Sequence, residues 1–100
     1  MIKHIVMWRL KDEAEGRRKD ENAKAMKSIL EDLKGKIDVI QHLEVGINFA
    51  KSDAAFDVAL YSEFKSKEDL EKYINHPEHK KVVEFINKVR EERYVVDYEI

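Results

Sequence analysis

The sequence contains no cysteine, a single proline and three glycines among its 100 residues. Without cysteine, the chain has no disulfides, no thiolate chemistry and no cysteine-ligated zinc. No apolar run approaches the roughly 20 residues that a membrane span needs, and Lys3, His4 and Arg9 interrupt the apolar region that a signal peptide would require. The 19 basic and 21 acidic side chains are interspersed, so no basic stripe is available for nucleic acid. We therefore expect a cytoplasmic protein that binds neither membranes nor nucleic acids.

The apolar residues that are present follow two periodicities within one domain, residues 1–100. Alternation of apolar and polar residues predicts strands, and spacings of three and four predict helices. In chain order, the expected elements are a strand at 2–11, a helix from the low twenties to between Gly35 and Asp38, strands at 39–49 and 57–64, helices at 66–75 and 77–89, and a strand at 93–100. This β-α-β-β-α-β order, with the second helix divided at Pro77, predicts an α+β, ferredoxin-like fold with an antiparallel sheet and helices on one face.

Several of the expected strands carry apolar residues on both faces. The first strand places Ile2, Val6 and Trp8 on one side, yet Ile5 and Met7 occupy the other. Helices cover only one side of such a sheet, and a large uncovered apolar face marks an interface. We therefore expect a homodimer in which two sheets pack face to face.

The segment Tyr73 to His79 surrounds the only proline with a phenol and two imidazoles. Because proline removes an N–H and clashes with the preceding turn, Pro77 should end one helix and occupy the first position of the next. Tyr73 then lies on the last turn of the incoming helix and His79 on the first turn of the outgoing one. We predict that both side chains point inward.

His79 and Asp97 are the candidate catalytic residues, together with Tyr73. A position near the positive end of a helix keeps the His79 ring neutral and able to act as a base. Asp97 lies in an apolar strand, where a buried carboxylate needs a partner, so it could accept a hydrogen bond from His79 and fix its tautomer. The alternatives are that His79 is a satisfied core histidine and that Asp97 caps a loop or pairs with Arg93.

The candidate substrate-binding residues line the same expected space. They comprise His4, Val6 and Trp8 of the first strand, Val58 of the third, Tyr73, and His76. His76 is also the expected N-cap of the helix after Pro77, and Trp8 is also a candidate for the core or the interface. A metal site built from His4, His76 and His79 matches no established spacing, so we expect neither a metal nor a cofactor.

Five segments give the chain its resemblance to a known family: Lys3-His4-Ile5-Val6, Glu44-Val45-Gly46-Ile47-Asn48, Glu63-Phe64-Lys65-Ser66, the Tyr73-x-x-His76-Pro77-x-His79 element and Val95-Val96-Asp97-Tyr98. Over nearly its whole length the chain resembles the Dabb family of stress-responsive dimeric A/B barrel domains. The resemblance implies a ferredoxin-like fold that dimerises through its sheets into an α/β barrel. A plant branch of the family includes polyketide cyclases, which close a linear polyketide by intramolecular aldol condensation without a cofactor.

The resemblance also implies roles for the matching residues. His79 corresponds to the general acid/base, Asp97 to the residue that orients it, Tyr73 to a substrate-holding residue and His4 to a pocket residue. The pocket walls depart from the plant enzymes, because the first helix offers aliphatic residues instead of aromatics and Arg93 stands at an expected apolar position.

Two functions are therefore expected. The first is cofactor-free acid/base chemistry, of the lyase or cyclase type, on a small hydrophobic or carbonyl-containing molecule. The second is a non-catalytic dimeric domain that binds a ligand or another protein. An enclosed cleft that reaches His79 favours the first function, whereas a filled interior with Tyr73 and His4 hydrogen-bonded to each other favours the second.

Overall fold

Four strands of the chain pair into one antiparallel sheet. The computed structural model describes residues 1–100, and the sheet order is β4-β5-β1-β6. These strands are β1 (Ile2–Leu10), β4 (His42–Ile47), β5 (Val58–Phe64) and β6 (Arg90–Glu99). β1 lies inside the sheet and pairs with β5 on one side and β6 on the other.

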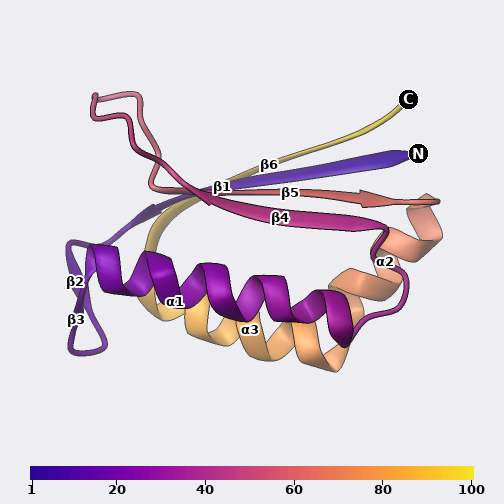
Figure 1. Cartoon of the computed structure of the whole chain (residues 1–100), viewed down its shortest axis with the longest axis horizontal. Coiled ribbons are helices and arrows are strands. Elements are labelled where there is room, and N and C mark those ends of the chain that lie inside the picture. Colours follow the sequence, from indigo (N-terminus) through magenta and orange to yellow (C-terminus); the bar gives the residue numbers. More distant parts are fainter.

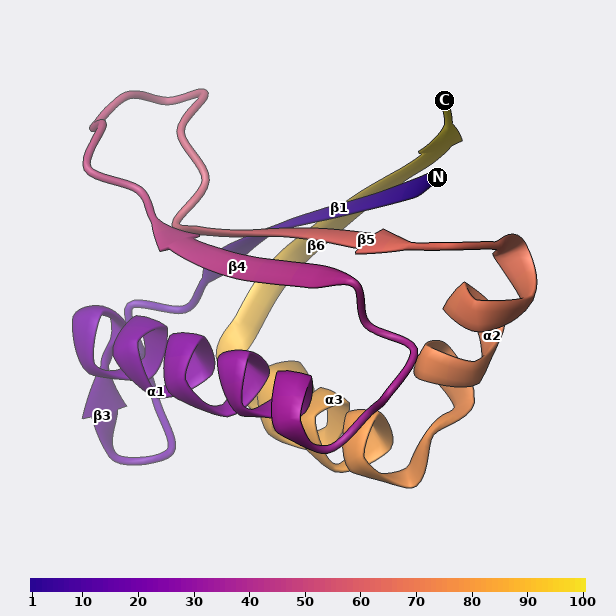
Figure 2. The same ribbon diagram turned by 45° about the vertical axis from the view of Figure 1, so that its right-hand side comes forward.

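The helices lie on one face of this sheet, as Figures 1 and 2 show. They are α1 (Lys19–Glu31), the short 3₁₀ helix η1 (Asp32–Gly35), α2 (Lys67–Asn75) and α3 (Pro77–Val89). α1 and α3 run beneath the length of the strands, and α2 covers one end (Figure 1). The predicted ferredoxin-like arrangement is confirmed, including the helix division at Pro77.

The core forms where the alternating strand residues meet the helices. On β1, Ile2, His4, Val6, Trp8 and Leu10 are all buried, whereas the residues between them are not. Nineteen buried apolar residues form one cluster between the sheet and the helical layer. His4, Asn22 and Ser62 are the only polar residues that are buried with them.

Capping residues determine how α2 and α3 begin. The Ser66 hydroxyl accepts a hydrogen bond from the Asp69 N–H at 3.1 Å, as expected for an N-cap serine. His76 caps α3 in the same way, because its Nδ1 accepts from the Glu78 N–H at 3.1 Å. Pro77 occupies the start of α3, where its missing N–H leaves no helical acceptor unpaired.

The structure differs from the sequence prediction in the connection that precedes α1. The polar composition of residues 11–22 predicts an irregular segment, but they include the hairpin β2 (Glu13–Ala14) and β3 (Arg17–Arg18), and α1 already begins at Lys19. Glu15 and Gly16 provide the hairpin turn with φ of 53° and 74°, a region that glycine enters without steric cost.

Gly46, in the middle of an expected strand, suggests a bulge or a close backbone approach, and the structure shows neither. It pairs with Ala59 in continuous register, and a Cβ added at this position would have no atom of another segment within 4 Å. The irregularity of the sheet lies instead between Arg9 and Leu10, where β1 shifts register against β6.

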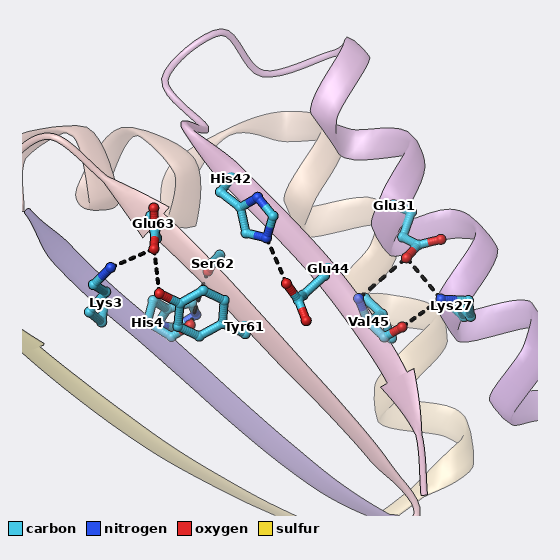
Figure 3. Close-up of polar contacts among 10 residues, drawn as sticks. All are labelled: Lys3, His4, Lys27, Glu31, His42, Glu44, Val45, Tyr61, Ser62 and Glu63. Carbon is cyan, nitrogen blue, oxygen red and sulfur yellow. Dashed lines mark hydrogen bonds and ion pairs between the residues drawn. The ribbon is translucent and has the colours of Figure 1, made fainter.

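The second face of the sheet has no helix over it. Met7, Tyr94, Val96 and Tyr98 expose 42%, 58%, 53% and 44% of their surface there, which is an unusual amount for large apolar side chains on one face. Beside them, Lys3 Nζ lies 2.5 Å from Glu63 Oε2, and the Tyr61 hydroxyl donates to the same carboxylate (Figure 3).

A pair of charged residues from α1 covers the open edge of the sheet at β4. Glu31 Oε2 accepts from the Val45 N–H at 3.3 Å, and Lys27 Nζ donates to the Val45 carbonyl at 2.6 Å (Figure 3). The same two side chains bond each other at 2.9 Å. Because unpaired edge groups invite pairing with other chains, this contact satisfies the middle of the edge strand and ties α1 to the sheet.

Replacing Glu31 with Gln should destabilise the fold by about 0.5–1 kcal/mol in denaturant unfolding at pH 7. The Lys27 ammonium and the Val45 N–H hold the pKa of Glu31 below its ordinary value of 4.5. Its stabilisation is therefore complete above pH 4.5 and is lost as the pH falls through the lower folded-state value. The difference between wild type and Glu31→Gln should shrink over that interval. Glu71→Gln, on an exposed position of α2, serves as the control, and an equal effect of both changes would contradict the role of Glu31.

Candidate active site

The first part of the site is a histidine–carboxylate pair between neighbouring strands. The register of β1 and β6 sets His4 directly opposite Asp97, so both side chains leave the sheet on the helical side. His4 Nδ1 lies 2.5 Å from Asp97 Oδ1. Because an ionised carboxylate can only accept, the His4 Nδ1–H donates to it, and the neutral tautomer of the ring that fits this contact has its lone pair on Nε2.

The sequence prediction paired Asp97 with His79, and this pairing is wrong. Asp97 contacts His4, whereas His79 Nδ1 lies 3.0 Å from the Ile74 carbonyl oxygen. The helix break explains the difference. The Glu78 N–H, which would bond that carbonyl in a continuous helix, donates to His76, so the Ile74 carbonyl needs another donor.

The side chains of His79 and Tyr73 both favour their neutral forms. Burial lowers the pKa of His79 below its ordinary 6.5, although the bond to Ile74 opposes this, and the charge of Arg93 adds to the lowering. Burial also raises the pKa of Tyr73 well above its ordinary value. At neutral pH, His79 is therefore an acceptor through Nε2 and Tyr73 retains its O–H donor.

The rings of the site gather around Tyr73. Its ring centre lies 4.4 Å from that of His79 and 6.1 Å from that of His4, and Phe64 packs against it at 5.0 Å. Tyr73 is almost completely buried. Three elements, β1, α2 and α3, thus bring two imidazoles and a phenol together, as the sequence predicted.

A small cavity of about 40 Å³ lies among these side chains. Its walls come from β1, β5, β6 and the helices: His4, Val6, Trp8, Leu30, Leu60, Tyr73, His79, Val82, Val83, Ile86, Asn87 and Arg93. Of the predicted substrate-binding residues, His4, Val6, Trp8 and Tyr73 line it. Val58 lies outside it, at the Trp8 end of β5, and so does His76, whose ring nitrogen caps α3.

The family resemblance placed Arg93 at a pocket-wall position, and Arg93 lines the cavity together with Asn87, a polar residue that the sequence prediction did not assign to the site. Arg93 follows from the alternation of β6, because it lies four residues before Asp97 and therefore on the same face. Asn87 follows from the helical spacing of α3, eight residues after His79. Both are exposed, and Val83 beside them is half-buried, so the wall between α3 and β6 is the accessible side of the cavity.

The cavity has room for only a few water molecules, since one water needs roughly 10–15 Å³ of such space. Pockets for drug-sized ligands are on the order of 300–1,000 Å³. A larger ligand therefore requires the exposed wall to move. Within the chain, the Tyr73 hydroxyl forms no hydrogen bond to His4. The hydroxyl of Tyr73 and the Nε2 atom of His4 therefore remain available to a ligand.

No group of three or more His, Asp or Glu side chains is arranged to hold a metal ion. The chain also has no helix with the length and apolar character to cross a bilayer.

The fold and the site place the chain in a class of proteins, the ferredoxin-like α+β domains. One face of its sheet is open, and the other face carries a histidine–tyrosine cluster beneath the helices. The family model described as "Stress responsive A/B Barrel Domain" (Dabb) matches residues 2–100. The chain therefore belongs to the Dabb family, and the resemblance seen in its sequence is confirmed.

Individual relatives agree with this assignment. The stress-response A/B barrel domain-containing protein DABB1 of Arabidopsis thaliana is 30% identical over 105 residues, which is 98% of this chain and 46% of that protein. The chain thus spans less than half the length of this curated relative.

Two solved structures are similar along their whole length. A dimeric protein of unknown function with a ferredoxin-like fold, from Bacteroides fragilis, is 35% identical with a TM-score of 0.84, covering 99% of this chain and 95% of that one. The hydroxynitrile lyase of Passiflora edulis has a TM-score of 0.82 at 17% identity, covering 99% and 92%. At that identity the lyase shares the fold alone.

Protonation of His79 should be measurable by following its Cε1–H resonance in a pH titration. We expect a midpoint below 6.5, and a higher midpoint in Arg93→Leu, because removal of the positive charge makes protonation easier. The sign for stability follows: the unfolded chain takes up the proton first, so the unfolding free energy falls as pH drops below 6.5. His79→Gln should lose this part of the pH dependence. A midpoint at or above 6.5 would contradict the burial of the ring.

Proposed function

We propose that the chain performs cofactor-free proton transfer on a small carbonyl compound, as the first step of lyase- or cyclase-type chemistry. The supporting observation is the His4–Asp97 pair at 2.5 Å beside His79 and Tyr73, since burial lowers the pKa of His79 and raises that of Tyr73, which favours a neutral imidazole and a protonated phenol. This combination supplies a base, a group that positions it and a donor for a developing oxyanion.

His4 acts as the base in this proposal. Its Nε2 accepts a proton from the carbon next to the carbonyl, and the electron pair moves to the carbonyl oxygen to form an enolate. Asp97 positions the ring and stabilises its positive charge by accepting from Nδ1. Tyr73 donates its O–H to the enolate oxygen, while His79 Nε2 accepts from a second hydroxyl or from water. Attack of the enolate carbon on another carbonyl, with return of the proton from His4 to the new alkoxide, completes an aldol step.

The second candidate is a non-catalytic dimeric domain. The observation that favours it is the cavity volume of about 40 Å³, which admits no ligand of ordinary size without rearrangement. In this case the His4–Asp97 pair has only a structural task, since an imidazole buried without a partner is costly. The two candidates predict different behaviour towards small ketones.

Exchange of ketone α-protons for deuterium tests the first candidate directly. We expect the protein to accelerate exchange of butanone in D₂O, as followed by NMR. His4→Gln and Tyr73→Phe should each lower the rate by at least about 100-fold, the typical contribution of one acid/base or oxyanion-stabilising group.

The matched control is His42→Gln, the same change on the other face of the sheet, where His42 bonds Glu44 at 2.7 Å (Figure 3). It should retain the wild-type rate. A wild-type rate no higher than that of free imidazole, or equal rates in wild type and a folded His4→Gln variant, would favour the non-catalytic domain.

We also propose that the open sheet face joins two copies of the chain into a homodimer. The exposed Met7, Tyr94, Val96 and Tyr98 support this, since monomers rarely leave such a patch in water. The B. fragilis relative, which is dimeric, supports it as well. The site in the helical layer faces away from this interface, so each copy would keep its own cavity.

Neighbouring residues of β6 offer a matched test of the interface. Val96 lies on the open face and Val95 on the helical face, with similar exposures of 53% and 46%. We expect wild type and Val95→Lys to sediment as two chains, and Val96→Lys to shift towards one chain because it buries a charge. A wild-type mass of a single chain would contradict the proposal.

A further inference from the structure

Arg93 is the one charged residue in the wall of the cavity that has no partner. It comes from the exposed edge strand β6 and lines the cavity together with His4, Tyr73 and His79. No carboxylate lies within ion-pair distance of its guanidinium. Glu92, its neighbour in sequence, belongs to the other face and bonds Arg9 at 2.9 Å, and Asp97 is engaged by His4.

A second donor without an acceptor lies opposite Arg93. The register of β1 and β6 pairs Arg93 with Trp8, which also lines the cavity. The indole N–H of Trp8 is buried and makes no hydrogen bond within the chain. Buried donors of this kind are uncommon and call for an explanation. Two unpaired donors on opposing residues at one end of the cavity fit a ligand group that carries acceptor oxygens.

We propose that Arg93 binds the carboxylate of the ligand, so that the site selects small oxo acids over neutral ketones. A guanidinium presents parallel N–H groups that match the two oxygens of a carboxylate. The His4–Asp97 pair lies four residues along the strands from the Trp8–Arg93 pair, about 13 Å between backbones, and the Arg93 and His4 side chains reach from these positions into the same small cavity. A carboxylate held at Arg93 therefore directs the rest of the molecule along the cavity towards His4, Tyr73 and His79.

The charge of Arg93 already acts on this site: it adds to the lowering of the His79 pKa that burial causes, and it opposes the rise that burial gives to the pKa of Tyr73. A bound carboxylate would offset that charge. The inference rests on the proposed function for the chemistry that follows binding, but the recognition itself can be measured separately.

The probes are 4-oxopentanoate and its methyl ester, which differ in charge and share the ketone. Trp8 is the only tryptophan, so its fluorescence reports from the cavity wall, and the Cε1–H resonances of the four histidines identify the site. We expect the acid to bind wild type and perturb Trp8, His4 and His79. Arg93→Leu should weaken the binding of the acid by at least about tenfold, which is the scale of one charge-assisted hydrogen-bonded pair. Arg93→Lys should weaken it by less. The ester should bind weakly and equally to all three proteins.

Arg17→Leu is the matched control, because Arg17 is an exposed arginine on β3 that also forms no ion pair and lies outside the cavity. It should bind the acid as wild type does. Equal binding of acid and ester, unchanged binding in a folded Arg93→Leu variant, or no response of wild type to either probe would overturn the inference.

The α-proton exchange of the two probes distinguishes this inference from the proposed function. Binding of the acid that depends on Arg93, without exchange of its α-protons, would support carboxylate recognition by Arg93 and contradict the proposed catalysis. Exchange of the ester and acid at equal rates, independent of Arg93, would uphold the catalytic proposal and remove the carboxylate selectivity.

Discussion

The contact between His4 and Asp97 is the interaction on which the rest of the site depends. It follows from the β1–β6 register, which sets the two residues opposite each other on the helical side of the sheet. A one-residue slip would turn Asp97 to the open face. The register is held by the burial of Ile2, Val6, Trp8 and Leu10 on β1, so the same apolar alternation that builds the core also assembles the pair.

The division of the helix at Pro77 provides the other half of the site. It releases the Ile74 carbonyl from its helical donor, and the His79 ring takes over that role. His76, a predicted pocket residue, instead caps the N-terminus of α3 at this helix break. One proline thus fixes the tautomer of His79 and brings its ring against Tyr73. The two imidazoles of the site owe their tautomers to different partners, one a carboxylate and the other a backbone carbonyl.

Sequence reasoning recovered the fold and the members of the cluster, because these depend on periodicity. The strand alternation, the helix stripes and the proline break were sufficient to predict the sheet, the two-part helix and the inward direction of Tyr73 and His79. The partner of Asp97 could not be found in this way. It depends on which strands are neighbours and in what register, and the sequence shows only that Asp97 shares a face with Arg93. The small cavity volume was equally out of reach, since it results from side-chain packing across three elements.

The most direct test of the His4–Asp97 pair is the tautomer of His4, read from the ¹⁵N resonances of its ring at neutral pH. We predict a proton on Nδ1 and a lone pair on Nε2 in wild type. We also predict loss of this preference in Asp97→Asn, where an amide can donate as well as accept. A proton on Nε2 in wild type, or the same tautomer in both proteins, would contradict the proposed task of Asp97 and with it the assignment of His4 as the base.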